Sequence, residues 1–438
     1  MKLIHFDSNF SYLSFSPSGG ICQLTIHFVM NDSVPAPKSL FRTGRYILFW
    51  ASSLFSNIGT WMQQVAQPWV VLGLTNSPFW VGLDSFALNA PGLLFTLWGG
   101  VLADRFERRK IVLFFQSIQF LCVLTMVVLL LAGWLSVWMI VVISFLVGVT
   151  DSLSMPAFQS IITSMVEEKD IHRAVSLNSA QFNLSRILGP AIAGAVIVKF
   201  GAVVCFSANA ASYVPFFLSL YFIYPRGGLK IKQKQVELVP TPQIKKFGDL
   251  LSNPKVHLPL LITFANGLFC APLITFSAVL IKNVFQREVG DYGEAMIAFG
   301  IGGLLGAGTS FISLPPSFKG NKLASLLAIL LGFAAIAVAL NHSFHVLLFL
   351  LGVSGACLTA SNISVNVFLQ ENIINTIRGR VISLYQLALS GGIALGALLT
   401  GFTVSLLTIS NALLINGILA TAFQIWLFRK QNKAFTNE

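Results

Sequence analysis

Two ionisable side chains stand alone inside long apolar stretches of this sequence. Asp84 lies about six residues into one stretch, and Arg186 lies about eleven residues into another, or ~16 Å along a helix. A charge at such depth in a membrane is costly unless it faces water or a partner, so such residues mark ion and substrate paths. We expect Asp84 and Arg186 to serve substrate binding or proton coupling. The alternative is a fixed structural ion pair.

Amide and hydroxyl side chains form a stripe near the start of the first long apolar segment. Its members are Ser53, Ser56, Asn57, Thr60, Gln63, Gln64 and Gln67. Their spacing of three and four residues places them on one helix face, which would line a cavity or pack against another helix. Asn57, Gln63 and Gln67 are candidate substrate contacts, and Asn362 belongs to a similar row much later in the chain. Amides beside aromatic residues suit an amphipathic or polycyclic solute.

A dense charged cluster separates two apolar stretches at residues 99–110. Its charged residues are Asp104, Arg105, Glu107, Arg108, Arg109 and Lys110. Hydrocarbon would not tolerate this cluster, so it must form a short turn at a membrane surface.

Other kinds of chemistry find little support in the sequence. No glycine-rich phosphate-binding loop of the Gly-x-x-x-x-Gly-Lys-Ser/Thr type occurs, and no His/Cys/Glu spacing suggests a metal site. Of the five cysteines, Cys122, Cys205, Cys270 and Cys357 fall within predicted membrane spans and Cys22 lies near the N-terminus, so no disulfide framework is expected. We therefore expect no enzyme, no cofactor and no metal ion.

The composition identifies the elements that must position these side chains. Of the 438 residues, 55% are hydrophobic and 10% are charged, and the mean hydropathy is +0.78. This predicts an all-α integral membrane protein, because a helix of ~20 apolar residues crosses a bilayer. Twelve such helices in two pseudo-symmetric bundles of six are expected, with cores near Tyr46–Leu74, Pro78–Ala103, Ile111–Ala132, Val137–Ser154, Ala174–Lys199, Val203–Tyr224, Val256–Lys282, Glu294–Leu314, Leu323–Leu340, Val346–Val367, Val381–Ser405 and Thr408–Phe428.

The formal net charge of +12 follows topology and does not indicate a nucleic-acid partner. With the N-terminus in the cytoplasm, almost every basic residue falls in a cytoplasmic segment, as the positive-inside rule requires. The exceptions are Lys2, Arg186, Lys199, Lys282 and Arg287. Both termini are therefore predicted to be cytoplasmic.

The predicted domain organisation places a basic linker between two equal halves. The segments are a leader and cytoplasmic stretch at 1–45, an N-terminal bundle at 46–224, a cytoplasmic linker at 225–255, a C-terminal bundle at 256–428 and a tail at 429–438. Residues 1–29 do not resemble a signal peptide, and we consider Met30 a possible natural start.

The two halves also resemble each other in sequence. A shift of 207 residues, about half the chain, superimposes pairs such as Arg173 on Arg380 and Gly189 on Gly396. Small residues recur every fourth position in four spans: Gly92, Thr96 and Gly100; Ser185, Gly189 and Ala193; Ala298, Gly302 and Gly306; Gly392, Gly396 and Thr400. Such ladders let helices approach closely. They favour helices that slide between the halves, with static packing as the alternative.

Residues 100–110 resemble the loop 2–3 signature of the major facilitator superfamily, Gly-x-Leu-Ala-Asp-Arg-x-x-Arg-Arg-Lys. Residues 59–66, 74–78 and 183–190 are similar to a bacterial subfamily of secretion effectors that includes enterobactin exporters and, more loosely, macrolide efflux proteins. Glu107 departs from this pattern, because many superfamily members have glycine there. The corresponding turn of the second half, 314–322, has basic residues but no carboxylate. The resemblance therefore implies a cytoplasmic lock built mainly from the first half.

In that family, the loop 2–3 motif latches the cytoplasmic side of the outward-open state. The resemblance implies that Asp104 accepts backbone N–H groups near Gly379 and Arg380, and that Arg108 pairs with Asp151. Gly100 and Arg109 belong to the same motif. The alternative is that these charges only anchor the topology.

A second family motif lies in the fifth span, where Gly189 and Pro190 resemble the Gly-Pro motif of superfamily antiporters. Proline bends a helix and glycine permits close contact, so this pair would act as hinge and seal. In the family the motif accompanies export, whereas a plain proline kink is the alternative.

These features together predict a secondary transporter that exports a small organic molecule by alternating access, driven by inward proton flow. The substrate would be drug-like, siderophore-like or a metabolite, and we expect a monomer in the bacterial cytoplasmic (inner) membrane. Uptake or lysophospholipid flipping on the same fold is one alternative. A non-transporting membrane receptor is another, although it would not need the latch charges.

Overall fold

A computed structural model of the chain describes residues 13–18, 21–26, 44–166, 170–223, 252–308, 321–373 and 375–435. The chain divides into two units, Met1–Ile47 and Leu48–Glu438. In the first unit, β1 (Leu13–Ser18) and β2 (Ile21–Ile26) form an antiparallel hairpin, in the register that pairs Leu13 with Ile26. This hairpin lies in the predicted leader and was not anticipated there.

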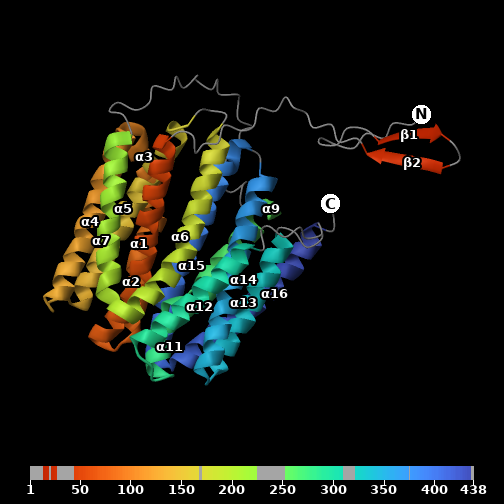
Figure 1. Ribbon diagram of the computed structural model, residues 1–438. Coiled ribbons are helices and arrows are strands. Elements are labelled where there is room, and N and C mark those ends of the chain that lie inside the picture. Colours follow the sequence, from red (N-terminus) through yellow and green to blue (C-terminus); the bar gives the residue numbers. More distant parts are fainter. Residues whose placement is uncertain are drawn as a thin grey trace. The chain divides into compact units, whose positions relative to one another are not determined.

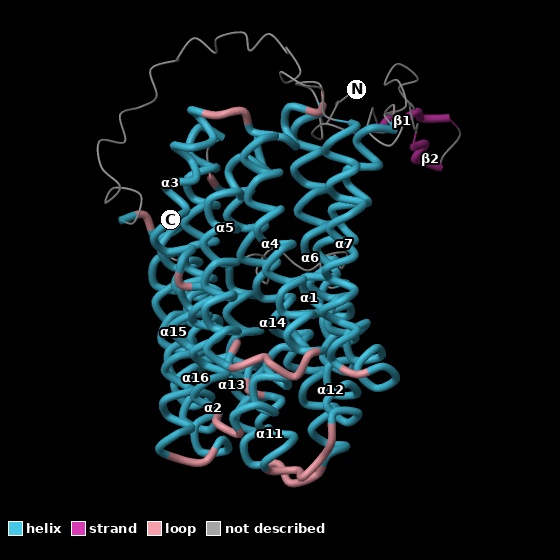
Figure 2. Tube along the Cα trace, turned by 90° about the vertical axis from the view of Figure 1, so that its left-hand side faces the viewer, coloured by secondary structure: helices cyan, strands magenta, loops and turns pink. Residues whose placement is uncertain are grey.

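Helices make up the described remainder, running lengthwise with loops at both ends (Figure 2). They are α1 (Gly44–Thr75), α2 (Pro78–Asn89), α3 (Pro91–Arg105), α4 (Arg108–Leu131), α5 (Val137–Ser164), α6 (Ile171–Phe200), α7 (Ala202–Ile223), α9 (Pro254–Ala265), the π-helical turn η3 (Asn266–Cys270), α10 (Pro272–Thr275), α11 (Ser277–Asn283), α12 (Val289–Gly308), α13 (Asn321–Leu340), α14 (Phe344–Asn372), α15 (Asn375–Leu406) and α16 (Ile409–Phe435).

Proline and glycine set several of these boundaries. Pro78, Pro91 and Pro254 each occupy the first turn of a helix, where the missing N–H has no intrahelical partner to lose. Gly201 follows α6 with φ of +78°, a conformation that a residue with a Cβ adopts only under strain. The helical stretches Pro78–Thr96 and Trp98–Arg105 meet at 57°, so the second predicted span is bent.

Nine helices of the described residues are long and apolar enough to cross a membrane, or ten with the bent pair α2–α3. The segment from α9 to α11 crosses as one unit although η3 interrupts it. The other two long helices, α1 and α12, complete the series of twelve predicted spans. α5 continues ten residues beyond the predicted Ser154, and the predicted span end at Leu314 lies outside the described residues.

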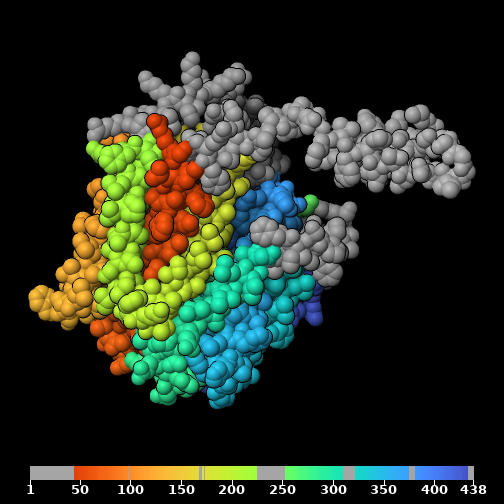
Figure 3. All heavy atoms as spheres, viewed as in Figure 1, coloured from red at the N-terminus to blue at the C-terminus, as the bar shows by residue number. Residues whose placement is uncertain are grey.

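Two helix pairs join the first half, α1–α7, to the second half, α9–α16. α6 packs against α12, as Figures 1 and 3 show, and α2 packs against α15. Glycines bring both pairs into backbone contact: a Cβ on Gly293 would lie 2.5 Å from the Gly194 carbonyl oxygen, and one on Gly82 would lie 3.0 Å from the Gly401 Cα. The two seams are therefore closed to any larger residue.

The small-residue ladders of α12 and α15 pack inside their own half, whereas Gly92 of α3 lies between Ser152 of its own half and Ser390 of the other half. Gly302 and Gly306 face α14, Gly392 faces α9, and Gly396 faces η3. In this conformation other glycines form the seams, which favours static packing for the ladders of α12 and α15, and sliding between the halves stays a prediction.

The same contacts support the internal repeat. Gly189 of α6 lies against Trp61 of α1, and Gly396 of α15 lies against Leu268 of η3. The 207-residue shift that relates the two halves in sequence superimposes Gly189 on Gly396 and Trp61 on Leu268. The repeat is thus present in helix packing as well as in residue identities.

We call the face where α1 and α9 begin the linker face, and the opposite face, where α2 and α12 begin, the far face. Both seams lie toward the far face, and two hydrogen bonds reinforce the closure there. Tyr292 donates to the Val65 carbonyl at 2.6 Å and stacks on Trp69, and Lys282 Nζ donates to Asn76 Oδ1 at 2.8 Å. The halves are therefore joined at the far face.

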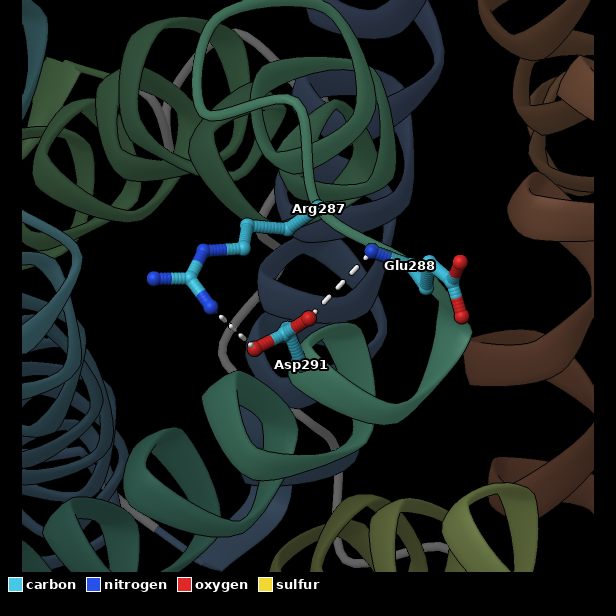
Figure 4. A network of polar contacts seen from close by, with 3 residues as sticks. All are labelled: Arg287, Glu288 and Asp291. Atoms are coloured by element: carbon cyan, nitrogen blue, oxygen red, sulfur yellow. Dashed lines mark hydrogen bonds and ion pairs between the residues drawn. The ribbon is translucent and has the colours of Figure 1, made fainter.

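A small polar network fixes the start of α12 on the far face (Figure 4). Arg287 Nη1 donates to Asp291 Oδ1 at 3.4 Å, and the Glu288 N–H donates to Asp291 Oδ2 at 3.2 Å. A carboxylate that accepts an N–H group beside the first turn of a helix stabilises that terminus.

Candidate functional site

Asp84 is buried among three helices of the first half, α1, α2 and α5. Its side chain is 5% exposed. Gln67 Nε2 of α1 donates to its two carboxyl oxygens at 2.9 and 2.8 Å, and Ser144 Oγ of α5 donates to Oδ1 at 2.6 Å. Gln67 and Ser144 are neutral, so the carboxyl group of Asp84 has hydrogen-bond partners but no countercharge among the described residues.

The amide stripe of α1 continues these hydrogen bonds through the core of the first half. Gln63 Nε2 donates to Gln67 Oε1 at 3.2 Å, and Asn209 Nδ2 of α7 donates to Gln63 Oε1 at 2.7 Å. Thr60 Oγ1 in turn lies 3.5 Å from Asn209 Oδ1. Gln63 and Gln67 are thus buried members of one chain of amides that ends on Asp84, which we call the first-half polar network.

The rest of the stripe follows α1 away from Asp84. Asn57 Nδ2 donates to Gln181 Oε1 of α6 at 3.3 Å, so this candidate links α1 to α6. Tyr213 of α7 donates to Gln119 Oε1 of α4 at 3.4 Å, close to Asp151 of α5, whose side chain is exposed. Polar side chains therefore occupy the middle of the first half from Asp84 to Asp151.

Arg186 occupies a different place and does not meet Asp84. Asp84 is six residues from the start of α2, or ~9 Å along it, whereas Arg186 is fourteen residues from the end of α6, or ~21 Å. The Arg186 guanidinium carbon lies 5.6 Å from the centre of the Trp61 ring. Tyr385 of α15, in the second half, is the ionisable neighbour of Arg186. The fixed ion pair considered for Asp84 and Arg186 is absent.

Gly189 and Pro190 belong to the construction of the Arg186 environment. Gly189 has no side chain, which lets the Trp61 side chain rest directly on α6 one turn beyond Arg186. Phe182 packs on the edge of the Trp61 ring at 6.1 Å between centroids. Pro190 lies within α6, and the helix continues unbroken past it to Phe200.

The second half has its own polar network, which contains no charge. Asn266, the first residue of η3, donates to Ser361 Oγ at 3.0 Å and to Asn362 Oδ1 at 3.4 Å. Gln424 Nε2 of α16 donates to Asn266 Oδ1 at 3.1 Å. Asn362 also accepts a 3.3 Å hydrogen bond from Tyr385 at its carbonyl oxygen. We call these residues the second-half polar network.

The charged turn between α3 and α4 is exposed at the linker face. Asp104 is exposed, and Glu107 pairs with Lys110 at 3.1 Å. Arg109 differs from its neighbours because it is buried: its Nη2 donates to the Tyr221 carbonyl at 2.9 Å and its guanidinium lies over the Tyr221 ring. Arg109 therefore anchors α4 to α7 in this conformation.

The proposed latch partners are not in contact here. Arg108 and Asp151, both described, form no ion pair. Gly99 of α3 lies against the Ser152 carbonyl of α5, so Asp151 lies at about the level of Gly99. Gly99 is six residues before the end of α3 at Arg105, which is ~9 Å along the helix. A Cβ on Gly100 would have no neighbour within 4 Å. Asp104 was expected to meet the region of Gly379, where the side chains lie outside the described set.

Several site residues were not found from the sequence. Single polar residues in apolar helices carry no periodic signal, which is why Ser144, Asn209 and Gln424 were missed. Asn266 had a usable signal, because an amide within an apolar run that contains glycine and proline is where helices become irregular. Tyr385 gave no signal at all.

Comparison with known proteins places the chain in a family. The model of the transmembrane secretion effector family matches residues 35–437. The staphyloferrin A transporter of Staphylococcus aureus (strain NCTC 8325 / PS 47) is 25% identical over 377 residues, covering 84% of this chain and 92% of its own. The multidrug efflux pump Tap of Mycolicibacterium fortuitum is 25% identical over 371 residues, covering 82% of this chain and 89% of its own.

A solved structure shows the same fold at low identity. The crystal structure of the nucleoside transporter NupG superimposes with a TM-score of 0.69 at 12% identity, covering 88% of this chain and 98% of that one. The chain therefore belongs to the transmembrane secretion effector family, and it is a multi-pass membrane transporter with the twelve-helix fold of the major facilitator superfamily.

Proposed function

We propose that this protein exports a small organic molecule from the cytoplasm by alternating access, in exchange for protons. The two curated relatives carry the names of a siderophore transporter and a drug efflux pump, which supports a substrate of one of these kinds. The observation that carries proton coupling is Asp84, a buried carboxyl group whose hydrogen-bond partners are all neutral. It can gain or lose a proton without breaking an ion pair, and membrane-embedded carboxyl groups of this kind act as proton relays.

The arrangement of the halves supports alternating access. The seams α6–α12 and α2–α15 close the molecule toward the far face, whereas the loop 2–3 motif forms no ion pair with any described residue of the second half, and the Cβ position of Gly100 is vacant. We propose that the linker face is cytoplasmic, as the distribution of basic residues favours, and that this conformation is open to the cytoplasm. Both termini and the linker 225–255 would then be cytoplasmic, with the bundles at 46–224 and 256–428.

In the opposite state we propose that the latch forms. Asp104 would reach the start of α15 near Gly379, and Gly100 would let α3 approach the second half, because its Cβ position is vacant here. Arg108 would approach Asp151 only if α3 or α5 shifts along its axis by more than a helical turn. Arg109 would keep its contact with Tyr221 and carry α4 and α7 as one body.

The amides then divide into two groups. Gln63 and Gln67 form their hydrogen bonds with Asn209, with Asp84 and with each other, so we assign them to proton coupling. Asn57 lies beside Gln181 near the Trp61 and Arg186 environment, where we place the substrate. Asn362 supports Tyr385 from the second half.

Proteoliposomes test this proposal with a coupling measurement that does not depend on the orientation of the protein. Purified protein is reconstituted, and staphyloferrin A or a panel of efflux-pump drugs is offered outside vesicles whose interior is acidic, equal or alkaline. Proton exchange predicts accumulation in the acidic vesicles, because protons leave as substrate enters. Accumulation in alkaline vesicles would instead indicate proton-coupled uptake, and equal flux in all three would indicate an uncoupled transporter.

The alternatives give separate results in the same vesicles. A lysophospholipid flipping activity would move a fluorescent lysophospholipid between leaflets without solute accumulation. A receptor of this fold would give neither. The control is Glu371→Gln, a carboxyl-to-amide change at the exposed end of α14, which should behave as the unmodified protein.

A further inference from the structure

Arg186 is a membrane-embedded charge that the coupling proposal does not use. It lies half-way along α6 with a partly exposed side chain. No hydrogen bond or ion pair joins its guanidinium to any described residue. Because arginine does not lose its proton in proteins, this charge persists in every state of the transport cycle.

Two contacts hold the guanidinium in place without neutralising it. Trp61 lies under it at 5.6 Å, a cation–π arrangement that stabilises a cation without cancelling its charge. Gly189 fixes the position of Trp61 on α6, and Phe182 supports the edge of the ring. The N–H donors of Arg186 are therefore preorganised and have no acceptor among the described residues.

The place of Arg186 between the halves matters for what it could bind. Tyr385 of α15 is its electrostatic neighbour in the second half, and Tyr385 is itself held by a 3.3 Å hydrogen bond to the Asn362 carbonyl. A ligand bound at Arg186 would therefore contact Trp61 of the first half and lie on the side of α6 that Tyr385 influences. No carboxylate of the described residues forms an ion pair with Arg186.

We propose that Arg186 and Trp61 form a subsite for an organic anion, in which the guanidinium binds a carboxylate and the Trp61 ring contacts the adjoining apolar or aromatic body. A planar guanidinium can bind a carboxylate through two parallel hydrogen bonds, and aromatic residues supply most of the apolar contact in ligand sites. The inference rests on the proposed transport function and gives its substrate class: a soluble molecule with at least one carboxylate or a similar oxyanion.

Binding to detergent-purified protein tests the subsite without transport. The probe is 2-naphthoate, and 2-naphthylmethanol is a neutral control of the same shape; dissociation constants come from ligand-observed NMR titration. We expect naphthoate to bind at least tenfold more tightly than the alcohol. Arg186→Gln should remove this preference, and Arg186→Lys, which keeps the charge without the planar fork, should retain part of it.

Matched variants separate binding from folding. Arg173→Gln makes the same change on the same helix, at an exposed residue that pairs with Asp170 at 3.6 Å, and should leave naphthoate binding unchanged. Trp61→Phe should weaken naphthoate and the alcohol by similar factors, because it trims the shared apolar contact. If the melting curve shows that Arg186→Gln is poorly folded, the subsite is tested by comparing the preference of Arg186→Lys for naphthoate with that of the unmodified protein.

Two results would overturn the proposal. One is equal binding of naphthoate and naphthylmethanol to the unmodified protein, or unchanged naphthoate binding after Arg186→Gln. The other is displacement of naphthoate by dioleoylphosphatidylglycerol tenfold more readily than by glycerol phosphate, which would assign the subsite to a lipid headgroup. A failure of proton-driven flux with naphthoate binding intact would reject the coupling proposal and leave this one standing.

Discussion

The polar networks of the two halves differ in one respect that bears on mechanism. The first-half polar network ends on a carboxyl group, Asp84, which is held by Gln67 and Ser144. The second-half polar network joins Asn266 and Gln424, each 0% exposed, to neighbouring neutral groups only. Both networks cross several helices of their own half, so both can hold that half together as a unit.

The difference suggests a division of labour between two copies of one ancestral unit. A network of neutral amides gives rigidity at all pH values, whereas a network that contains a carboxyl group can change its charge. The charged turn shows the same asymmetry, because 99–110 contains carboxylates and 314–322 contains none. We therefore expect the first half to respond to protons and the second half to serve as its rigid partner. Four substitutions test this comparison.

The largest effect is expected for Asp84→Asn. The amide preserves shape and can still bond with Gln67, but it cannot take up or release a proton, so proton-driven accumulation should fall at least 100-fold. Counterflow exchange of labelled substrate without a pH gradient should persist in the same vesicles. Accumulation at the unmodified level would remove Asp84 from the coupling mechanism.

Asp104→Asn should come next, with transport reduced at least tenfold at unchanged surface expression. The amide accepts helix N-terminal N–H groups more weakly than a carboxylate, so the latch of the opposite state would be less stable. The matched change in the second half is Lys322→Gln at the start of α13, which should leave transport unaltered. Equal losses of transport from both variants would mean that the turn at 99–110 and the turn at 314–322 both act as cytoplasmic gates.

Asn266→Leu is expected to affect stability rather than coupling. It leaves Asn362 Oδ1 without this donor and removes one acceptor of Gln424 Nε2, which keeps its bond to the Ile262 carbonyl, at a cost of about 1–3 kcal/mol for an orphaned group. The apparent melting temperature in detergent should drop, while the ratio of driven flux to exchange stays constant. A change in that ratio would give the second-half network a coupling role.

The smallest effect is expected for Gly100→Ala. A methyl group there meets no atom within 4 Å, so the melting temperature should remain within the error of measurement, whereas Gly99→Ala would press on the Ser152 carbonyl and cost about 1–3 kcal/mol. If Gly100→Ala slows transport while stability is kept, Gly100 contacts the second half in the opposite state, as the latch proposal requires.

The fold was largely accessible from the sequence because its signals are long and repetitive. Apolar stretches and basic loops gave the series of spans, and the 207-residue shift gave the repeat, since each feature integrates over many residues. Boundaries were less accurate: α5 runs ten residues beyond the predicted Ser154, because its last turns are amphipathic and stay helical outside the apolar window.

The site was less accessible because it depends on which helix faces which. The sequence left open a fixed ion pair between Asp84 and Arg186, yet the two charges occupy separate environments. The burial of Arg109 against Tyr221 could not be read from a motif in which four basic residues look alike. The glycines of the seams differ from those of the ladders only by the side of the helix on which they stand.

The amides of α1 have a consequence for how the protein is made. α1 is not among the nine described helices that are long and apolar enough to cross a membrane by themselves. Its buried Gln63 and Gln67 weaken its partitioning into lipid. During synthesis α1 would therefore have to remain beside the insertion machinery until α5 and α7, which bond to these amides, arrive. Biogenesis of this transporter should therefore be sensitive to translation pauses and to chaperones that hold nascent helices at the membrane.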